Sequence, residues 1–229
     1  MKFGELVPAT FVKRGNRFTA GVYLESGGVS TAFIPTTGRL TGALMPGCRV
    51  WLEPAENKER QTPYTLVLSE LEGGGLCSVN AYMANWLFGE AMENRSLDVF
   101  PYPMVEREVS FGRSRLDFRL TEGDEICWVE VKSVTYAEEG VGMFPDAPTT
   151  RGRKHLGELA KLVEQGHRAS AVFVVQREDA GRFAPFERID PEFAEELRRV
   201  SAAGVEVHAF RCDVSVEEVL IAEEIPIIL

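Results

Sequence analysis

The sequence contains few cysteines and few histidines, and each shortage excludes a class of site. Its four cysteines lie far apart and form no CxxC pair, so neither a disulfide scaffold nor a zinc site is expected. The three histidines are scattered, which argues against a histidine metal centre and against a Ser-His-Asp triad. Glycine motifs that bind phosphate, of the Walker or the dinucleotide type, are also missing.

Long apolar runs are missing as well. No window reaches the roughly 18 apolar residues that a membrane helix needs, and the first residues, MKFGELVPATFVKRG, lack the apolar core of a secretory signal. We therefore expect a cytoplasmic protein with no membrane partner. Apolar residues make up 45% of the chain and charged residues 26%, the balance of a globular protein. A length of 229 residues allows one large domain or two modest ones.

Positive charge is in short supply. The formal net charge is −10, which argues against nucleic acid, because neutralising phosphates requires Lys and Arg. The two halves differ, however: residues 1–80 hold 8 basic and 7 acidic side chains, and residues 81–229 hold 17 basic and 28 acidic ones. A nuclease site needs clustered carboxylates for its metal, so the acidic half remains compatible with nucleic acid if basic patches or a bound cation offset the repulsion.

Residues 1–80 consist of short segments in which apolar and polar residues alternate, separated by clusters of Gly, Pro and Asn. The segments are RFTAGVYLE, GVSTAFIP, CRVWLEP and TPYTLVLSE. Five or so short strands predict a compact β-barrel, and the OB-fold is favoured because it commonly binds oligonucleotides. A barrel without a ligand fits the pattern equally well. On such a barrel, Arg14, Arg17 and Arg39 would line a nucleic-acid groove, and neighbouring phenylalanines would either stack on bases or fill the core.

Residues 81–229 alternate between helical and strand patterns. Helices are expected over residues 81–94, with Met83, Trp86, Leu87 and Ala91 on the apolar face, over 153–166, and from the cap Asp190 to Gly204. Strands are expected over residues 104–111, 114–121, 125–134, 170–177 and 204–212. Residues 135–152 show no clear period and are interpreted as a long loop. This order predicts an α/β domain with a central mixed sheet.

Two of these strands present acidic side chains. The alternation of a strand sets Asp117 apart from its apolar neighbours, and it places Glu130 and Lys132 on one face of the next strand. Twelve residues with a turn signal separate the two acids, so a hairpin would bring the carboxylates together. Like charges that close favour a divalent cation between them.

Oxygen ligands of this kind suit Mg²⁺ or Mn²⁺, and the carbonyl of Val131 could supply one more. Lys132 would face the attacking water, while the metal stabilises charge on a phosphate. Hydrolysis of a phosphodiester follows from these roles. A bare Glu-x-Lys pair is also typical of a salt bridge on a half-exposed strand, and the protein would then be a structural or interaction protein.

Further polar residues could support such a site. Four of them stand together where a helix is expected to start: Arg151, Arg153, Lys154 and His155. Backbone N–H groups and basic side chains can jointly hold a phosphate there, although a solvated helix start fits equally well. Arg115 shares the strand of Asp117 and adds to the nucleic-acid candidates. Gln176 follows a buried strand and could support the site, or simply end the strand.

Asp117 and Glu130-Val131-Lys132, in an α-β-β-β-α-β order, resemble the PD-(D/E)XK restriction-endonuclease-like superfamily. A more specific resemblance, to the sugar fermentation stimulation protein A family, spans most of the chain. It is carried by ATFVKRGNRF, PTTGRL, REVSFGRSRLDF, VEVKSVT, FPDAPTTRGRKHLGEL and FVVQR. The chain departs from that family at Thr36, where members usually have asparagine.

The family resemblance implies an N-terminal OB-like β-barrel over residues 1–80 and a restriction-endonuclease-like α/β domain over 81–229. It also implies DNA binding and a role in regulating sugar (maltose) metabolism. The superfamily pattern implies metal binding by Asp117 and Glu130, catalytic support by Lys132, and a further acid on the first helix, for which Glu90 is the matching residue. A Mg²⁺-dependent nuclease and a DNA-binding transcriptional regulator without turnover both stay open, and a homodimer is compatible with the sequence.

Overall fold

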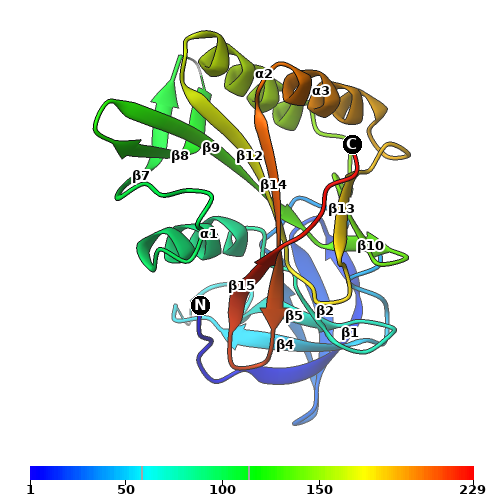
Figure 1. Ribbon diagram of the computed structural model, residues 1–229. Helices are drawn as coiled ribbons and strands as arrows, with labels where there is room; N and C mark the ends of the chain where they lie inside the picture. The colour runs from blue at the N-terminus through cyan, green and yellow to red at the C-terminus, as the bar shows by residue number, and fades with distance from the viewer. Residues whose placement is uncertain (58, 113) are drawn as a thin grey trace.

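The N-terminal strands close into a β-barrel that lies against an α/β layer (Figure 1). The computed structural model describes residues 1–57, 59–112 and 114–229. The barrel strands are β1 (Val7–Asn16), β2 (Thr19–Leu24), β3 (Val29–Phe33), β4 (Arg49–Pro54) and β5 (Tyr64–Glu70), in the order β3-β2-β1-β4-β5. A parallel pairing of β3 with β5 closes the barrel, and β6 (Leu76–Ser78) pairs with the outer part of β5.

Alternation along each strand fills the barrel. The side chains of Val22, Ala32, Val50 and Leu52 are fully buried, while their neighbours along the strands are more exposed. A strand with a period of two buries one face in this way. The barrel therefore has an apolar core of its own, as the alternating segments predict.

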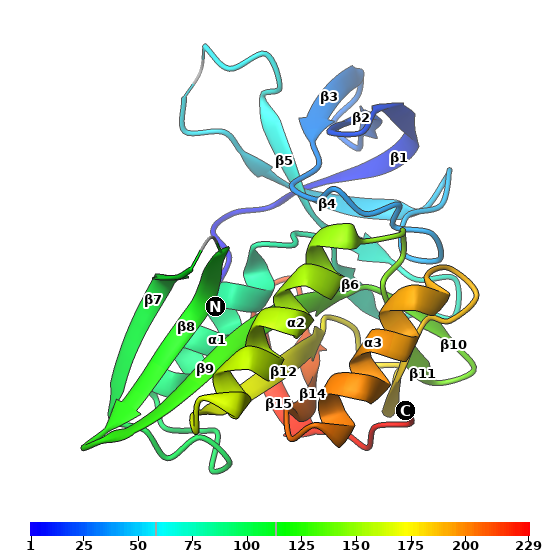
Figure 2. The ribbon, with the colours of Figure 1, turned by 90° about the horizontal axis from the view of Figure 1, so that it is seen from above.

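The α/β domain is built on a six-stranded mixed sheet. Its strands are β7 (Met104–Phe111), β8 (Ser114–Glu122), β9 (Glu125–Val134), β12 (Arg168–Val175), β14 (Glu206–Val214) and β15 (Val219–Glu224), in the order β15-β14-β12-β9-β8-β7. Strands β9, β12 and β14 are parallel. Strand β15 pairs antiparallel with β14, β8 pairs antiparallel with β9, and β7 pairs antiparallel with β8. Helix α1 (Met83–Glu93) covers one face, and α2 (Thr150–Glu164) and α3 (Pro191–Ala202) cover the other (Figures 1 and 2).

The predicted fold class is confirmed: an OB barrel precedes an α/β domain with a mixed sheet. The interpretation of residues 135–152 as one long loop is wrong. They contain a hairpin of β10 (Tyr136–Glu138) and β11 (Val141–Phe144). Strand β11 also pairs in parallel with β13 (Arg182–Pro185). Strands of three or four residues are too short to show a period, and their partner lies far along the chain. The edge strand β15 is likewise absent from the predicted order.

One buried carboxylate anchors the start of both covering helices. Asp190 is 2% exposed, and its side chain accepts a hydrogen bond from the backbone N–H of Phe193, over 3.0 Å, as the predicted cap of α3. It also accepts from the backbone N–H of Thr149, over 2.7 Å, just before α2. Since Thr149 in turn caps α2, the first turn of α2 is held in place.

Backbone hydrogen bonds tie the barrel to the α/β domain. The N–H of Ser78 donates to the carbonyl of Gln176 over 2.9 Å, and the N–H of Ala81 donates to that of Pro35 over 3.0 Å. Gln176 also links to β9 through a bond from its N–H to the carbonyl of Val134, over 2.9 Å. Within the part of the chain that the structure describes, no helix is long and apolar enough to cross a membrane.

Candidate active site

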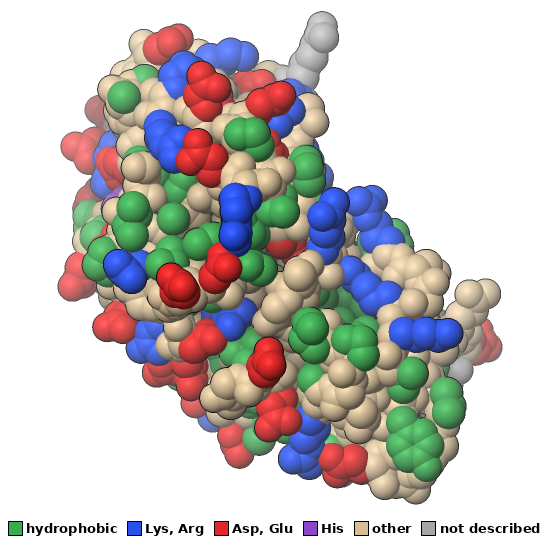
Figure 3. Space-filling view, turned by 90° about the vertical axis from the view of Figure 1, so that its right-hand side faces the viewer, with side chains coloured by type: hydrophobic (Ala, Val, Ile, Leu, Met, Phe, Trp, Pro, Cys, Tyr) green, Lys and Arg blue, Asp and Glu red, His purple; other side chains and the backbone are tan. Residues whose placement is uncertain are grey.

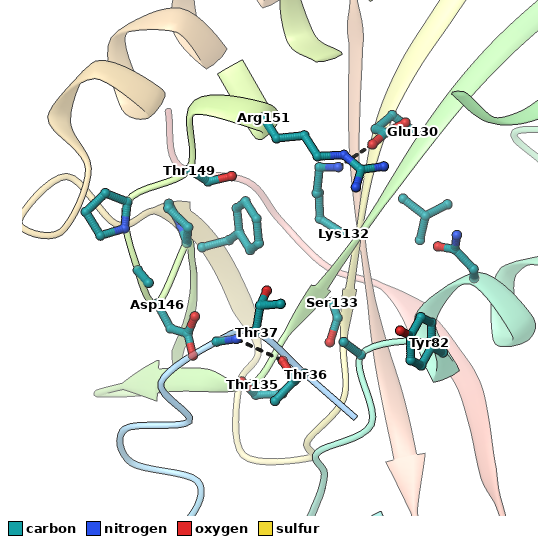
Figure 4. Close-up of a pocket in the computed structure, with 18 of the residues that line it drawn as sticks. Thr36, Thr37, Tyr82, Glu130, Lys132, Ser133, Thr135, Asp146, Thr149 and Arg151 are labelled. Carbon is teal, nitrogen blue, oxygen red and sulfur yellow. Dashed lines mark hydrogen bonds and ion pairs between the residues drawn. The ribbon is translucent and has the colours of Figure 1, made fainter. Parts of the chain in front are cut away.

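A cavity of about 330 Å³ opens where the barrel meets the α/β domain. Its walls come from the barrel loop Thr36–Gly38, the start of α1, strands β8 and β9, the loop after β11 and the first turn of α2. Figure 4 shows Glu130, Lys132 and Arg151 together at one end of the cavity. The cavity therefore collects residues from both domains.

Asp117 lies where two strands separate. The pairing of β8 with β9 runs from the hairpin turn as far as Phe118 opposite Val129 and does not include Asp117. Instead, the carboxylate of Asp117 accepts hydrogen bonds from the backbone N–H of Val131 and from the amide of Asn85, each over 2.8 Å. Burial raises the pKa of Asp117, and the charge of Glu130 raises it further. A nearby cation would therefore favour the ionised form.

One carboxylate oxygen of Glu130 has two partners, and the other has none among the described residues. Its side chain is 3% exposed, and its Oε1 atom contacts both the Nζ atom of Lys132 and the Nδ1 atom of His155. Its Oε2 atom is buried and has no hydrogen-bond partner among the described residues. Burial alone would raise the pKa of Glu130, but Lys132 and His155 together lower it to about 2. A buried, charged oxygen without a partner is costly, so this atom is suited to a cation.

Lys132 lines the cavity and is 16% exposed. It forms the ion pair with Glu130 that the alternative interpretation expects, but not on a half-exposed strand: both side chains are largely buried. Trp128 lies in the core cluster beneath α2 and α3, while Val129 and Val131 lie in the one beneath α1. The strand alternation expected for this segment is thus present.

Glu90 does not reach the cavity. Its carboxylate pairs with the N-terminal ammonium group of Met1 over 2.6 Å, whereas Asn85 lines the cavity and binds Asp117. An α-helix turns about 100° per residue, so five residues place Glu90 about 140° away from Asn85 around α1. The residue of the first helix that reaches the cavity is therefore the amide Asn85, and not the predicted acid Glu90. Within the described ranges, no group of three or more His, Cys, Asp or Glu side chains could hold a metal ion.

Two of the predicted phosphate-binding arginines line the cavity: Arg17 from the barrel and Arg151 from the first turn of α2. Arg151 also lines a second hollow of about 320 Å³, together with Arg115, Lys154 and His155, among others. Figure 3 shows Lys and Arg side chains gathered where the two lobes of the molecule meet, beside a hollow in the surface. A local basic patch thus accompanies the acidic residues.

Arg14 and Arg153 are engaged elsewhere. Arg14 donates to the carbonyls of Gly38, Arg39 and Arg17 over distances of 2.9–3.0 Å, so its guanidinium supports the barrel loop. Arg153 pairs with Asp190 over 2.9 Å and with Glu192 over 2.8 Å. Acceptors within the chain therefore engage both guanidinium groups, and contact of these two arginines with nucleic acid stays a prediction.

Arg39 is exposed on the same loop but does not line the cavity. Gln176 is fully buried and lies behind the site: its amide donates to Ser133 Oγ over 2.6 Å and to the carbonyl of Asn80 over 3.2 Å. Since Ser133 lines the cavity, Gln176 positions the wall from behind and does not itself reach the cavity.

Several cavity residues escaped prediction, among them Asn85, Tyr82, Thr36 and Asp146. Asp146 accepts a hydrogen bond from the backbone N–H of Leu40 over 2.8 Å, which joins the loop after β11 to the barrel loop. Thr36 accepts one from the N–H of Gly38 over 3.1 Å, the turn that an asparagine at this position would also make. The segments PTTGRL and FPDAPTTRG carried the signal, but only as family resemblance.

Comparisons with known proteins agree over the whole chain. Residues 12–79 match the family model described as SfsA N-terminal OB domain, and residues 82–218 match that of the Sugar fermentation stimulation protein RE domain. A sugar fermentation stimulation protein homolog from Caldanaerobacter subterraneus is 42% identical over 98% of this chain and 97% of its own length. One from Moorella thermoacetica is 46% identical over 91% and 90%.

A solved structure is also similar. It is that of SfsA from Pyrococcus furiosus in complex with Ca²⁺, with a TM-score of 0.91, 30% identity, and coverage of 100% of this chain and 98% of that one. Both domains and their arrangement therefore have a solved counterpart.

Proposed function

This chain belongs to the sugar fermentation stimulation protein family, and from that premise we propose that it binds DNA and hydrolyses phosphodiester bonds with Mg²⁺ or Mn²⁺. One observation carries the proposal: two carboxylates and a lysine converge in a cavity, and one buried carboxylate oxygen has no partner among the described residues. The family name supports a link to sugar fermentation, and we include regulation of sugar metabolism in the proposal.

The donor atoms fit a hard divalent cation. Glu130 offers its unpartnered Oε2 atom, and Asp117, whose pKa is raised by burial and by Glu130, would gain from a positive charge beside it. Asp117, Glu130 and the carbonyl of Val131 would hold the ion. Oxygen donors of this kind suit Mg²⁺, Mn²⁺ and Ca²⁺, and the similar Pyrococcus furiosus protein was solved with Ca²⁺. When bound, such an ion activates water and stabilises charge on a phosphate.

The chain's own residues orient the reacting groups. Asn85 and the N–H of Val131 fix both oxygens of Asp117, and Lys132 and His155 fix Oε1 of Glu130. The ammonium group of Lys132 can donate to an attacking water or to a phosphate oxygen above it. Preorganised charges of this kind need no rearrangement during reaction, which is why they contribute strongly to catalysis.

Arg17 and Arg151 would receive the phosphates on either side of the scissile bond. They reach the cavity from different domains, so a bound strand would contact both. Arg151 belongs to the first turn of α2, where the helix dipole also favours an anion. Although the net charge of the chain is −10, these two arginines supply positive charge within the cavity, where a phosphate would bind.

Cleavage assays with and without metal test the proposal. The full chain is incubated with labelled single-stranded and double-stranded oligonucleotides in Mn²⁺, Mg²⁺ or EDTA. We expect metal-dependent cleavage that falls by at least about a hundredfold in Asp117→Asn, in the range of losses seen when one stabilising group is removed. Glu90→Gln, on the same helix as Asn85 but outside the cavity, is the matched control. Cleavage that persists in Asp117→Asn would refute this assignment.

A DNA-binding regulator without turnover is the second candidate. It is favoured by Asn85, which occupies the place of a further acid, and by the two contacts that engage Glu130 Oε1. Under this alternative, DNA binding weakens steeply with salt, and no substrate is cleaved with any of the metals. The same set of assays therefore separates the two candidates.

A further inference from the structure

An aromatic pair stands in solvent at the start of α1. Tyr82 is 61% exposed and Trp86 is 43% exposed, and their ring centroids lie 6.3 Å apart. The sequence predicts Trp86 on the apolar face of its helix, yet the structure turns it outwards. Leaving so much aromatic surface in water forgoes burial energy, so this pair is suited to a ligand.

The pair adjoins the candidate active site. Tyr82 lines the cavity, and Figure 4 shows it across the cavity from Asp146 and Thr149. Asn85, one turn further along the same helix, binds Asp117. The rings are therefore fixed, through one helix, relative to the carboxylates that would face the scissile phosphate.

The cavity itself is too small for a duplex. Its volume of about 330 Å³ lies near the lower end of pockets that hold small molecules, so one nucleotide fits. The barrel loop that forms one wall is tied down by the hydrogen bonds of Arg14 to Gly38 and Arg39 and by that of Leu40 to Asp146. A strand would therefore reach the carboxylates singly.

We propose that Tyr82 and Trp86 form a stacking platform for an unpaired nucleobase, so that the substrate class is single-stranded nucleic acid. This inference rests on the proposed function. Bases in a duplex stack on one another, whereas unpaired bases stack on exposed aromatic rings whatever their sequence. The basic side chains of Arg17 and Arg151 in the same cavity would hold the backbone of that strand.

Binding of a labelled oligo(dT) strand and of a blunt duplex of equal length tests the proposal. Anisotropy is measured in Ca²⁺ with the full chain. We expect the single strand to bind more tightly, and Tyr82→Ala and Trp86→Ala each to weaken its binding by about tenfold. Trp86→Phe should retain most of the affinity, because a flat ring remains. Tyr23→Ala, an exposed barrel residue outside the cavity lining, should bind as the unchanged chain does.

Tryptophan fluorescence supplies a second readout. Stacking of a base on Trp86 should quench part of the emission of the unchanged chain, and this quenching should vanish in Trp86→Phe. If the single strand binds but neither aromatic substitution to alanine weakens it, the platform is refuted while DNA binding stands. If neither strand nor duplex binds in Ca²⁺, Mg²⁺ or Mn²⁺, the proposed function fails and the platform with it.

Discussion

The carboxylate of Asp117 accepts a hydrogen bond from the backbone N–H of Val131 over 2.8 Å. This bond bridges the point where β8 no longer pairs with β9, and it sets the carboxylate beside the residue next to Glu130. If β8 and β9 stayed paired, the N–H of Val131 would take part in their backbone hydrogen bonds. Here it donates to the side chain of Asp117 instead. The strands can thus separate without leaving that N–H unpaired, which would be costly.

Metal binding should depend on Asp117. We expect Mn²⁺ at a hundred times its dissociation constant to stabilise the unchanged chain by about 2.7 kcal/mol. For a chain of this size, that raises the melting temperature by about 5 to 10 °C. Thermal scans of Asp117→Asn should lose this shift, while Glu90→Gln, which lacks a role in the cavity, should keep it. An equal shift in Asp117→Asn would show that the ion binds elsewhere.

Asn85→Asp should make the metal-free chain less stable and should strengthen its binding of metal. The substitution removes the amide donor to Asp117 and adds a third negative charge beside two carboxylates, so we expect the free energy of unfolding without metal to fall by about 1 to 3 kcal/mol. More carboxylate ligands strengthen binding of hard cations, so Mn²⁺ should bind more tightly by calorimetry. Weaker Mn²⁺ binding in Asn85→Asp would place the ion away from α1.

Much of the candidate site follows from local rules. Strand alternation was enough to set Asp117 apart from its apolar neighbours and to place Glu130 and Lys132 on one face, since a period of two leaves little freedom. The phase of α1 was harder to predict. The helix buries three members of the predicted apolar face, Met83, Leu87 and Ala91. The fourth, Trp86, is exposed, because the buried face is centred nearer to Ala84, Phe88 and Met92.

The walls of the cavity lie beyond local rules. Thr36, Tyr82 and Asp146 meet only because the barrel is tied to the α/β domain, through contacts such as that between Leu40 and Asp146, which are 106 residues apart. No periodicity reports such a contact. Nor could it show that Arg14 is occupied by carbonyls of its own barrel loop. Side-chain type alone therefore overestimates the number of free cationic residues.

Stability should decline at mildly alkaline pH because of His208. This histidine lies between Glu206, at 3.3 Å, and Glu224, at 2.7 Å, and its ring packs against that of Phe100. Burial lowers the pKa of His208, but the hydrogen bonds to the two glutamates outweigh it and raise the pKa above the usual value. The stabilisation is therefore complete below about pH 6.5 and is lost as the pH rises through the raised value.

Urea denaturation of His208→Gln measures this contribution. We expect the variant to be less stable than the unchanged chain by about 1 to 3 kcal/mol at pH 6, and the difference to shrink by pH 9. Glu206, whose pKa is lowered to about 2 by His208 and Arg168, contributes in a separate window. Its share is present above its usual pKa and is lost only as the pH falls towards 2. A difference that grows with pH would contradict the assignment for His208.

The hydrogen bond from the N–H of Leu40 to Asp146 should hold the barrel loop in place, and it should require glycine at position 38. A Cβ atom added at Gly38 would lie 2.6 Å from both carboxylate oxygens of Asp146, so Gly38→Ala should push that side chain off the N–H of Leu40. We expect Gly38→Ala and Asp146→Ala each to reduce the free energy of unfolding by about 1 to 3 kcal/mol. Both should also speed hydrogen exchange at Leu40, since the same bond is lost.

A double-mutant cycle isolates this contact. Because both substitutions break the same hydrogen bond, Gly38→Ala should cost little more once Asp146 is already alanine, giving an interaction energy of about 1 kcal/mol or more. Gly73→Ala is the matched control, since nothing lies within 4 Å of a Cβ added there. If Gly38→Ala costs the same in both backgrounds, its effect does not pass through Asp146, and the loop is held by Arg14 instead.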